Sequence, residues 1–342
     1  MTGTVRLGGS GLEVSEIGLG CMGITAFYGP PMADEAALAL FKGAHALGYS
    51  HFDTAEAYST KPGKFSDPDA RYNEEVLGAF LQTLPRESFT VATKYMPGFH
   101  EDKVDAATVA AALEASLQRL GLAYVDVYYC HRMPSSSEQV EEWMASAKAL
   151  VEAGKVRHIG LSEVGPAWLR RAHAVHPVSC VQQEWSLFTR NLEDGLLPVC
   201  KELGIGIVAY SPLARNLLCG PAAEGGPPTD WRKNHPRFEE GNFATNAEVA
   251  GRIAALASKR GLTAAQISLA WLYCKAKALG VAMVPIPGTT KLERAAENAA
   301  ACPVELKEEE VAQLEALGAM VSGARANSGY TSKGIEAQEA SL

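Results

Sequence analysis

Four side chains of different chemistry stand at the ends of short apolar segments of this sequence. Asp53 ends the segment Ser50–Asp53, Tyr58 follows shortly after it, and Lys94 and His131 each close or follow a similar segment. A tyrosine, with a pKa of about 10, is a poor proton donor until a neighbouring cation favours its phenolate. We expect Lys94 to supply that cation and Asp53 to hold it in place. His131 could hydrogen-bond a carbonyl oxygen and help to move or orient the proton.

Each of these residues also has an ordinary structural interpretation. Taken alone, Asp53 could cap a helix, Tyr58 could pack at a rim, Lys94 could be solvated, and His131 could be a structural histidine. Their joint placement at strand ends favours the functional interpretation, because the active sites of (β/α)₈ barrels lie where the strands end.

The elements that must position these residues alternate along the chain. The sequence predicts eight strands, at Glu16–Gly20, Ser50–Asp53, Phe89–Thr93, Val125–Cys130, Val156–Leu161, Ser179–Gln182, Gly206–Tyr210 and Ala282–Ile286. It predicts helices at 34–47, 73–83, 105–120, 137–153, 166–174, 192–203, 246–260, 263–277, 291–300 and 308–318. Continuous apolar strands are typical of parallel sheets covered on both faces. The pattern therefore predicts an α/β fold, a closed (β/α)₈ TIM barrel.

Other segments complete this architecture. We expect Asp34 and Asn73 to cap the helices that they begin, and Gly121 to end one. The segment VRLGGSGLEVSEI predicts an N-terminal β-hairpin that closes the barrel bottom. Two extended loops, 59–72 and 214–245, follow strands and are predicted to lie at the mouth. We expect residues 1–342 to form one domain, with a mobile tail at 327–342.

The segment Gly18–Gly23 matches G-x-G-x-x-G, which favours at first sight a Rossmann dehydrogenase. That motif needs a helix that opens at its third glycine, whereas Ile24–Pro31 contains two consecutive prolines. We therefore expect these glycines to let the first strand end close to a bound ligand.

With these motifs in view, the sequence resembles the aldo-keto reductase superfamily, in the longer-chain branch with a His-Arg pair after the fourth strand. The resemblance runs from GLGCMG (18–23) to ERAAEN (293–298). It implies a barrel that binds NADPH without a Rossmann domain and reduces an aldehyde or ketone. The implied catalytic tetrad is Asp53, Tyr58, Lys94 and His131, with Tyr58 as the general acid.

The resemblance also implies which residues contact NADP. They are Gly20 and Met22 at the first strand end, Ser162, Glu163 and Gln182 at the carboxamide, Tyr210 stacked on the nicotinamide, Ser211, Pro212, Leu213 and Arg215 near the pyrophosphate, and Gly288, Thr290, Lys291, Arg294, Glu297 and Asn298 at the adenosine end. Cations beside a 2′-phosphate favour NADP over NAD, which carries only a hydroxyl there.

Some residues depart from the family pattern. Ser59 stands where glycine is usual, Trp185 where tyrosine is usual, and Glu163 where many members have asparagine; Cys130 replaces a residue that is often polar. These departures leave the tetrad intact and leave the choice of carbonyl substrate open.

Composition limits the other function classes. The 342 residues carry a net charge of −8, which argues against a nucleic-acid partner. No apolar segment approaches the roughly 20 residues that span a bilayer, and the seven cysteines are scattered without metal-ligand spacing. We expect a cytoplasmic protein with no metal and no membrane partner, a monomer or weak homo-oligomer, although organellar targeting stays open. The alternative function is a cofactor-sensing barrel module with little turnover.

Overall fold

Eight parallel strands form the centre of the molecule. The computed structural model describes residues 2–61, 67–220, 227–331, 334–335 and 338. Its strands are β3 (Leu19–Gly20), β4 (His51–Asp53), β5 (Thr90–Tyr95), β6 (Val125–Cys130), β7 (Val156–Ser162), β8 (Cys180–Glu184), β9 (Gly206–Tyr210) and β10 (Met283–Pro285). Each pairs with the next along the chain, and a bridge between Gly20 and Gly288 joins the first strand to the end of the last. The predicted (β/α)₈ barrel is confirmed.

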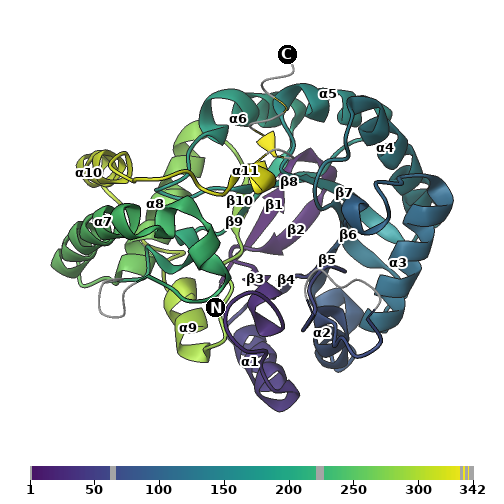
Figure 1. Ribbon diagram of the computed structural model, residues 1–342, viewed down its shortest axis with the longest axis horizontal. Helices are drawn as coiled ribbons and strands as arrows, with labels where there is room; N and C mark the ends of the chain where they lie inside the picture. Colours follow the sequence, from purple (N-terminus) through teal and green to yellow (C-terminus); the bar gives the residue numbers. More distant parts are fainter. Residues whose placement is uncertain (1, 62–66, 221–226, 332–333, 336–337, 339–342) are drawn as a thin grey trace.

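Helices surround this sheet as an outer ring (Figure 1). They are α1 (Asp34–Ala46), α2 (Asn73–Leu81), α3 (Ala106–Leu120), α4 (Ser137–Glu152), α5 (Pro166–Val175), α6 (Leu192–Leu203), α7 (Glu240–Lys259), α8 (Ala264–Leu279), α9 (Leu292–Ala299), α10 (Glu308–Gly318) and the short α11 (Ser328–Thr331). Short 3₁₀ helices lie at Gly8–Ser10, Met22–Ile24, Arg86–Ser88, Pro97–Phe99, Ala214–Asn216, Trp231–Asn234 and Pro236–Phe238. Among the described residues, no helix has the length and apolar character needed to cross a membrane.

Two predicted helix caps differ from the structure. Ala33, not Asp34, occupies the cap position of α1, and the Asp34 carboxylate pairs with Arg71 instead. Asn73 is the first residue of α2 rather than its cap. Its side chain accepts a hydrogen bond from Thr54 Oγ1 at 2.6 Å and donates to the Cys21 carbonyl at 2.8 Å. These long-range contacts use the polar groups that a local cap would have used.

Two further boundaries bear on the predicted helices. Helix α7 begins at Glu240 rather than at 246, because the chain turns into it directly after the 3₁₀ helix Pro236–Phe238. Gly121 does end α3, with the left-handed φ of 64° that favours glycine.

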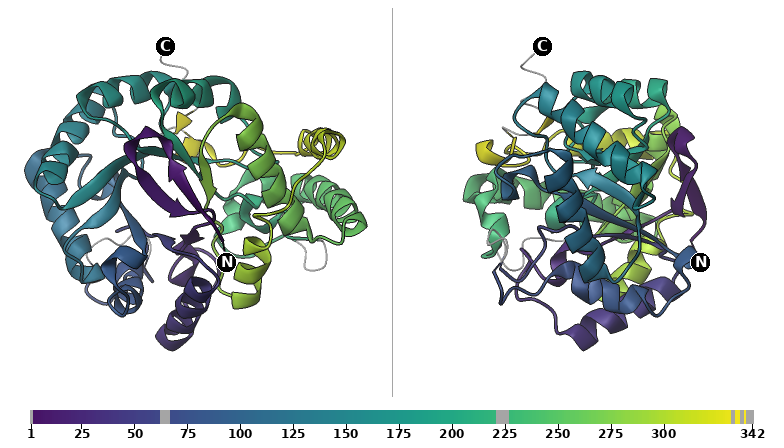
Figure 2. Two further views of the ribbon diagram at one scale, coloured as in Figure 1. Left: turned by 180° about the vertical axis from the view of Figure 1, so that it is seen from behind. Right: turned by 90° about the vertical axis from the view of Figure 1, so that its right-hand side faces the viewer.

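The N-terminal hairpin closes one end of the barrel, as predicted. Strands β1 (Thr4–Leu7) and β2 (Leu12–Ser15) pair antiparallel, and their apolar side chains join the cluster inside the barrel. Seen from behind, the hairpin lies across the barrel, and in the side view it lies opposite α11 (Figure 2). Since the hairpin blocks the bottom, ligands must enter at the strands' carboxyl ends.

The glycine-rich segment Gly18–Gly23 does not open a dinucleotide-binding helix. Only a 3₁₀ turn follows, and α1 begins at Asp34. A Cβ on Gly20 would lie 2.7 Å from the Ile286 carbonyl oxygen, and one on Gly288 would lie 2.8 Å from the Gly20 oxygen. The absence of a side chain at Gly20 therefore permits a close approach to the segment that follows β10, where the barrel closes, and its predicted contact with the cofactor stays a prediction.

Loops meet across the mouth. In the segment 59–72, of which 62–66 lie outside the described residues, Ser59 bridges Tyr72. In the segment 214–245, of which 221–226 lie outside the described residues, the Trp231 ring packs on Phe27 at 5.3 Å and on Tyr28 at 6.4 Å. The loop 214–245 therefore meets the segment that follows β3, which is distant from it in sequence.

Candidate active site

The four residues expected to transfer a proton lie together at the barrel mouth. Asp53 ends β4, Lys94 lies near the end of β5, and His131 follows β6 directly. Tyr58 lies in the loop after β4, where its backbone carbonyl accepts a hydrogen bond from the Asn73 amide at 2.8 Å. Parallel strands bring their carboxyl ends to one side of the barrel, which explains why residues from three strands converge.

Asp53 and Lys94 form a buried ion pair. The Lys94 ammonium, which is fully buried, donates to Asp53 Oδ1 at 2.5 Å and to the Thr54 carbonyl at 2.6 Å. The second carboxylate oxygen accepts from Gln182 Nε2 at 2.7 Å. Both oxygens of Asp53 are therefore engaged, which fixes the position of the ammonium.

Tyr58 lies between this pair and His131. Its ring centroid is 5.1 Å from Lys94 Nζ and 5.6 Å from the centroid of the His131 ring, which it meets edge-on at 83°. Both side chains are buried, 8% and 7% exposed respectively. The Tyr58 hydroxyl forms no hydrogen bond with any part of the chain that the structure describes. Its proton is therefore available to a ligand.

The electrostatic surroundings keep Tyr58 and His131 neutral. Burial raises the pKa of Tyr58 well above its usual 10.0, the Asp53 carboxylate raises it further, and the Arg132 guanidinium opposes the shift. Burial, then the Lys94 and Arg132 cations, lower the pKa of His131 well below 6.5. Burial and the Asp53 carboxylate therefore set the direction of the Tyr58 shift, and the expectation that Lys94 favours the phenolate stays a prediction.

Two residues predicted at the carboxamide of the nicotinamide have partners within the protein. Gln182 binds Asp53, as described above. Glu163, buried and with a left-handed φ of 61°, forms an ion pair with Arg325 at 2.5 Å and accepts a hydrogen bond from the Tyr210 hydroxyl at 2.7 Å. Ser162, by contrast, is buried at the end of β7 with Arg132 Nη1 at 3.5 Å from its oxygen.

The segment predicted near the pyrophosphate has an unusual backbone. Ser211, Ala214, Arg215 and Asn216 all have φ between 47° and 83°. Non-glycine residues rarely adopt this region, and such strain clusters at functional sites. The Arg215 guanidinium binds both carboxylate oxygens of Glu184 at 3.0 and 3.1 Å. Pro212 and Leu213 lie in the same turn.

Met22 belongs to an apolar cluster beside Tyr58. It packs, partly exposed, with Phe27, Met96 and Phe99 around Ala55, Ala57 and Tyr58. The residue predicted at the first strand end therefore lines the side of the mouth where the tyrosine lies.

The residues predicted at the adenosine end surround the start of α9. Lys291 occupies its cap position, and Thr290, Lys291 and Arg294 are exposed, whereas Asn298 is buried and Glu297 half-buried. Neither Lys291 nor Arg294 forms an ion pair with a described residue. Exposed cations at a helix N-terminus, without acid partners, suit a phosphate.

Several residues at the mouth were missed from the sequence. Arg325 binds Glu163 and Glu184, and Tyr330 in α11 contacts both Tyr210, hydroxyl to hydroxyl at 2.7 Å, and Arg132. In the tail 327–342, the described Gln338 side chain is buried and accepts a hydrogen bond from the Gly165 amide; the expected mobility of the tail stays a prediction. The remaining residues of the tail lie outside the described residues. In the sequence, only the residue types of Arg325, just before the tail, and of Tyr330, within it, could have indicated these contacts.

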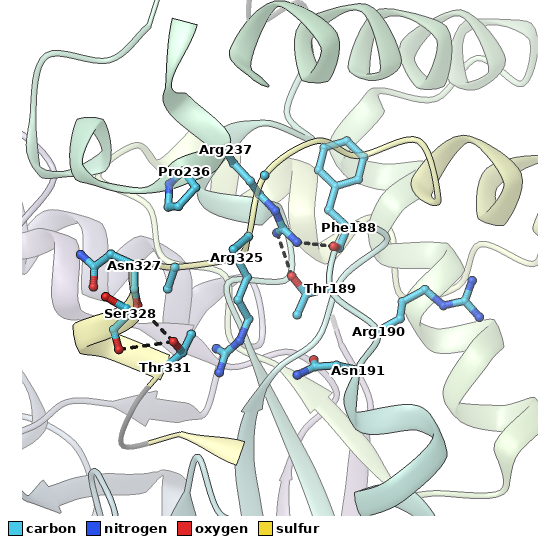
Figure 3. A pocket seen from close by; sticks show the side chains of 13 residues that line it. Phe188, Thr189, Arg190, Asn191, Pro236, Arg237, Arg325, Asn327, Ser328 and Thr331 are labelled. Atoms are coloured by element: carbon cyan, nitrogen blue, oxygen red, sulfur yellow. Dashed lines mark hydrogen bonds between the residues drawn. The ribbon is translucent and has the colours of Figure 1, made fainter. Parts of the chain in front are cut away.

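A cavity of about 570 Å³ lies beside this site. Figure 3 shows its walls, which come from the loop 188–191, from Pro236 and Arg237, and from residues 323–328 and Thr331. Arg237 Nη1 donates to Thr189 Oγ1 at 2.8 Å and thereby anchors the mouth loop. None of the four central residues lines this cavity, which makes it a neighbour of the site rather than part of it.

Comparison with known proteins adds independent findings. The sequence model of the aldo/keto reductase family matches residues 16–319. Probable aldo-keto reductase 1 of Glycine max is 41% identical over 316 residues, which cover 91% of this chain and 87% of the relative. The structure of an aldo/keto reductase from Klebsiella pneumoniae in complex with NADP and acetate is 27% identical, with a TM-score of 0.71 and coverage of 96% of this chain and 99% of that chain. The glycerol dehydrogenase of Gluconobacter oxydans, 23% identical with a TM-score of 0.77 over 95% of this chain and 98% of that chain, shares the fold.

Proposed function

Because this chain belongs to the aldo/keto reductase family, we propose that it is an NADPH-dependent oxidoreductase that reduces an aldehyde or ketone to an alcohol, with Tyr58 as the general acid. The observation that carries this proposal is the geometry around Tyr58. Its hydroxyl lacks a partner among the described residues, between a buried Lys94–Asp53 pair and a neutral His131.

The residues present fit NADPH, which supplies the hydride when it is bound. Thr290, Lys291 and Arg294 would hold the 2′-phosphate, since they are exposed at the start of α9 and the two cations have no acid partner among the described residues. At the other end, Ser162 would hold the carboxamide. The Tyr210 ring is already fixed by its hydrogen bond to Glu163, which supports a stacking role.

The proton step follows from the neutral state of Tyr58. Because its pKa is raised, Tyr58 keeps its proton until a stronger base forms beside it, and the alkoxide that develops on a reduced carbonyl is such a base. A neutral His131 can hydrogen-bond the carbonyl oxygen and orient it toward the hydroxyl. Lys94, 5.1 Å from the Tyr58 ring, then stabilises the phenolate that remains.

A screen of NADPH oxidation with aliphatic, aromatic and sugar aldehydes and with ketones tests this proposal, together with a fluorescence titration of NADPH. We expect tight NADPH binding, loss of NADPH absorbance with some of these carbonyls, and formation of the matching alcohol. Tight binding without turnover of any carbonyl would favour the cofactor-sensing module. Absence of NADPH binding would contradict both functions.

The proposal includes a small-molecule carbonyl substrate and a cytoplasmic location. The latter is supported by the seven cysteines, all of which are free thiols.

A further inference from the structure

Three acidic groups at the barrel mouth are paired with cations. Asp53 is paired with Lys94, and Glu163 with Arg325. Glu184 binds Arg215 at 3.0 Å. Buried charges normally require such partners, because an unpaired charge is costly to remove from water.

Arg132 is different. It takes part in no ion pair with any residue that the structure describes. Its guanidinium instead contacts neutral groups: the His131 carbonyl at 2.9 Å, Ser162 Oγ at 3.5 Å, and the hydroxyl of Tyr330, whose ring centroid lies 4.4 Å away. Arg132 is partly exposed, so that a ligand at the mouth can reach it.

The charge of Arg132 acts directly on the proposed proton donor. It opposes the rise in the pKa of Tyr58 and contributes to the lowered pKa of His131. Because Arg132 follows His131 and folds back onto its carbonyl, the guanidinium lies beside the place where a carbonyl substrate would bind. Apolar side chains, among them Met96 and Phe99, pack around Tyr58. A ligand here would meet both an apolar surface and a cation.

The 2′-phosphate of the cofactor is a poor candidate for the partner of Arg132. The cations that suit it lie at α9, which follows β10, whereas Arg132 follows β6. In the order β10-β9-β8-β7-β6-β5-β4-β3, these two strands lie on opposite sides of an eight-stranded barrel. The Glu163 carboxylate also favours the charge of Arg132, but it is itself ion-paired with Arg325, so that a direct anionic partner for Arg132 would have to come from a ligand.

We propose that Arg132 forms an anion-binding subsite beside Tyr58, and that the preferred substrates are aldehydes or ketones that carry a carboxylate group. This inference rests on the proposed function. A guanidinium matches a carboxylate in charge and in geometry, since its planar N–H groups can donate two parallel hydrogen bonds.

The test compares two aldehydes of similar shape and different charge, 4-carboxybenzaldehyde and its neutral methyl ester, with NADPH as the reductant. We expect the wild type to have a higher kcat/KM for the carboxylate. The variant Arg132→Gln should lower the ratio of the two kcat/KM values by about tenfold to a hundredfold, the range of a hydrogen bond between charged groups, mainly through the KM of the carboxylate. Added salt should weaken selection of the carboxylate in the wild type alone.

Two control variants separate this role from a structural one. Arg157→Gln removes the same charge from an exposed side chain at the start of β7, away from the mouth, and should leave the ratio unchanged. Tyr330→Phe removes the hydroxyl that Arg132 contacts but keeps the guanidinium, so that selection of the carboxylate should persist.

Three results would overturn the proposal. One is an equal loss for both aldehydes in Arg132→Gln, which would indicate a positioning role. Another is a raised Kd for NADPH in that variant with an unchanged ratio of the two kcat/KM values, which would indicate that the Arg132 guanidinium binds the cofactor. The third concerns a wild type that reduces neither aldehyde, for which the proposed function fails for this class. Calorimetry of terephthalate binding to the NADPH complex then tests the subsite separately. Binding that is lost in Arg132→Gln supports the subsite, and absence of binding to the wild type contradicts it.

Discussion

At the scale of single residues, the proton state of Tyr58 and His131 decides when the site can work. Tyr58 donates only below its pKa, which is raised above 10.0, and His131 is neutral only above its pKa, which is lowered below 6.5. Both conditions hold throughout the interval between these values. We therefore expect kcat/KM for carbonyl reduction to be flat across that interval at saturating NADPH. An inflection near pH 8 in the wild type that is absent in Tyr58→Phe would contradict this assignment.

The Lys94–Asp53 pair should contribute to folding as a unit. Removing one partner of a fully buried pair leaves a charge without compensation, a loss of about 3–5 kcal/mol. We expect Lys94→Met to lower the urea midpoint strongly, and the double variant Asp53→Asn/Lys94→Met to recover much of that loss, because no charge then remains buried. If the losses in the free energy of unfolding from the two single substitutions simply add in the double variant, Asp53 and Lys94 do not stabilise the fold as a pair.

The sequence predicts the identity of these central residues better than their partners. Asp53, Lys94 and His131 could be recognised because each closes or follows a short apolar strand, and the barrel then brings them together. The contacts of Glu163 could not be predicted. Its partner Arg325 lies 162 residues away, just before the tail, in a segment without helical or strand periodicity. The raised pKa of Tyr58 also depends on burial and on Asp53, which spacing alone does not show.

At the scale of elements, the start of α9 should decide between the two nicotinamide cofactors. Lys291→Ala and Arg294→Ala each remove a cation that would meet the 2′-phosphate. We expect each to raise the Kd for NADPH by about tenfold or more, as for other charge-assisted contacts, and to leave the Kd for NADH nearly unchanged. Fluorescence titration measures both constants.

Lys277→Ala is a matched control for these variants, since its side chain is 85% exposed at the end of α8 and bears the same charge. Equal weakening of NADPH and NADH binding in the α9 variants would contradict the assignment of Lys291 and Arg294 to the 2′-phosphate. So would a comparable effect in the control.

The helix and strand positions were largely predictable, and the exceptions have physical causes. Strand β6 and helix α6 have the predicted ends, because apolar runs bounded by turn residues leave little freedom. The prediction that Asp34 caps α1 was wrong, because the Asp34 carboxylate pairs with Arg71 from a distant loop. A local capping rule cannot anticipate a competing contact from a distant segment.

At the scale of the whole molecule, the barrel joins segments from the entire chain at one mouth. The hairpin blocks one end, and the loops and α11 surround the other (Figure 2). Residues that approach the mouth come from β4 near the N-terminus and from Tyr330 near the C-terminus. We propose that the chain folds as one domain, since the bridge between Gly20 and Gly288 joins the first barrel strand to the last.

The most direct test of the central claim is a single-turnover measurement with NADPH bound before a carbonyl substrate is added. We predict that the wild type oxidises its bound NADPH in one fast phase. Tyr58→Phe should bind NADPH with the same Kd but oxidise it about 10²–10⁴-fold more slowly, the usual contribution of a general acid. Oxidation at the wild-type rate in Tyr58→Phe would show that another group donates the proton and would contradict the account.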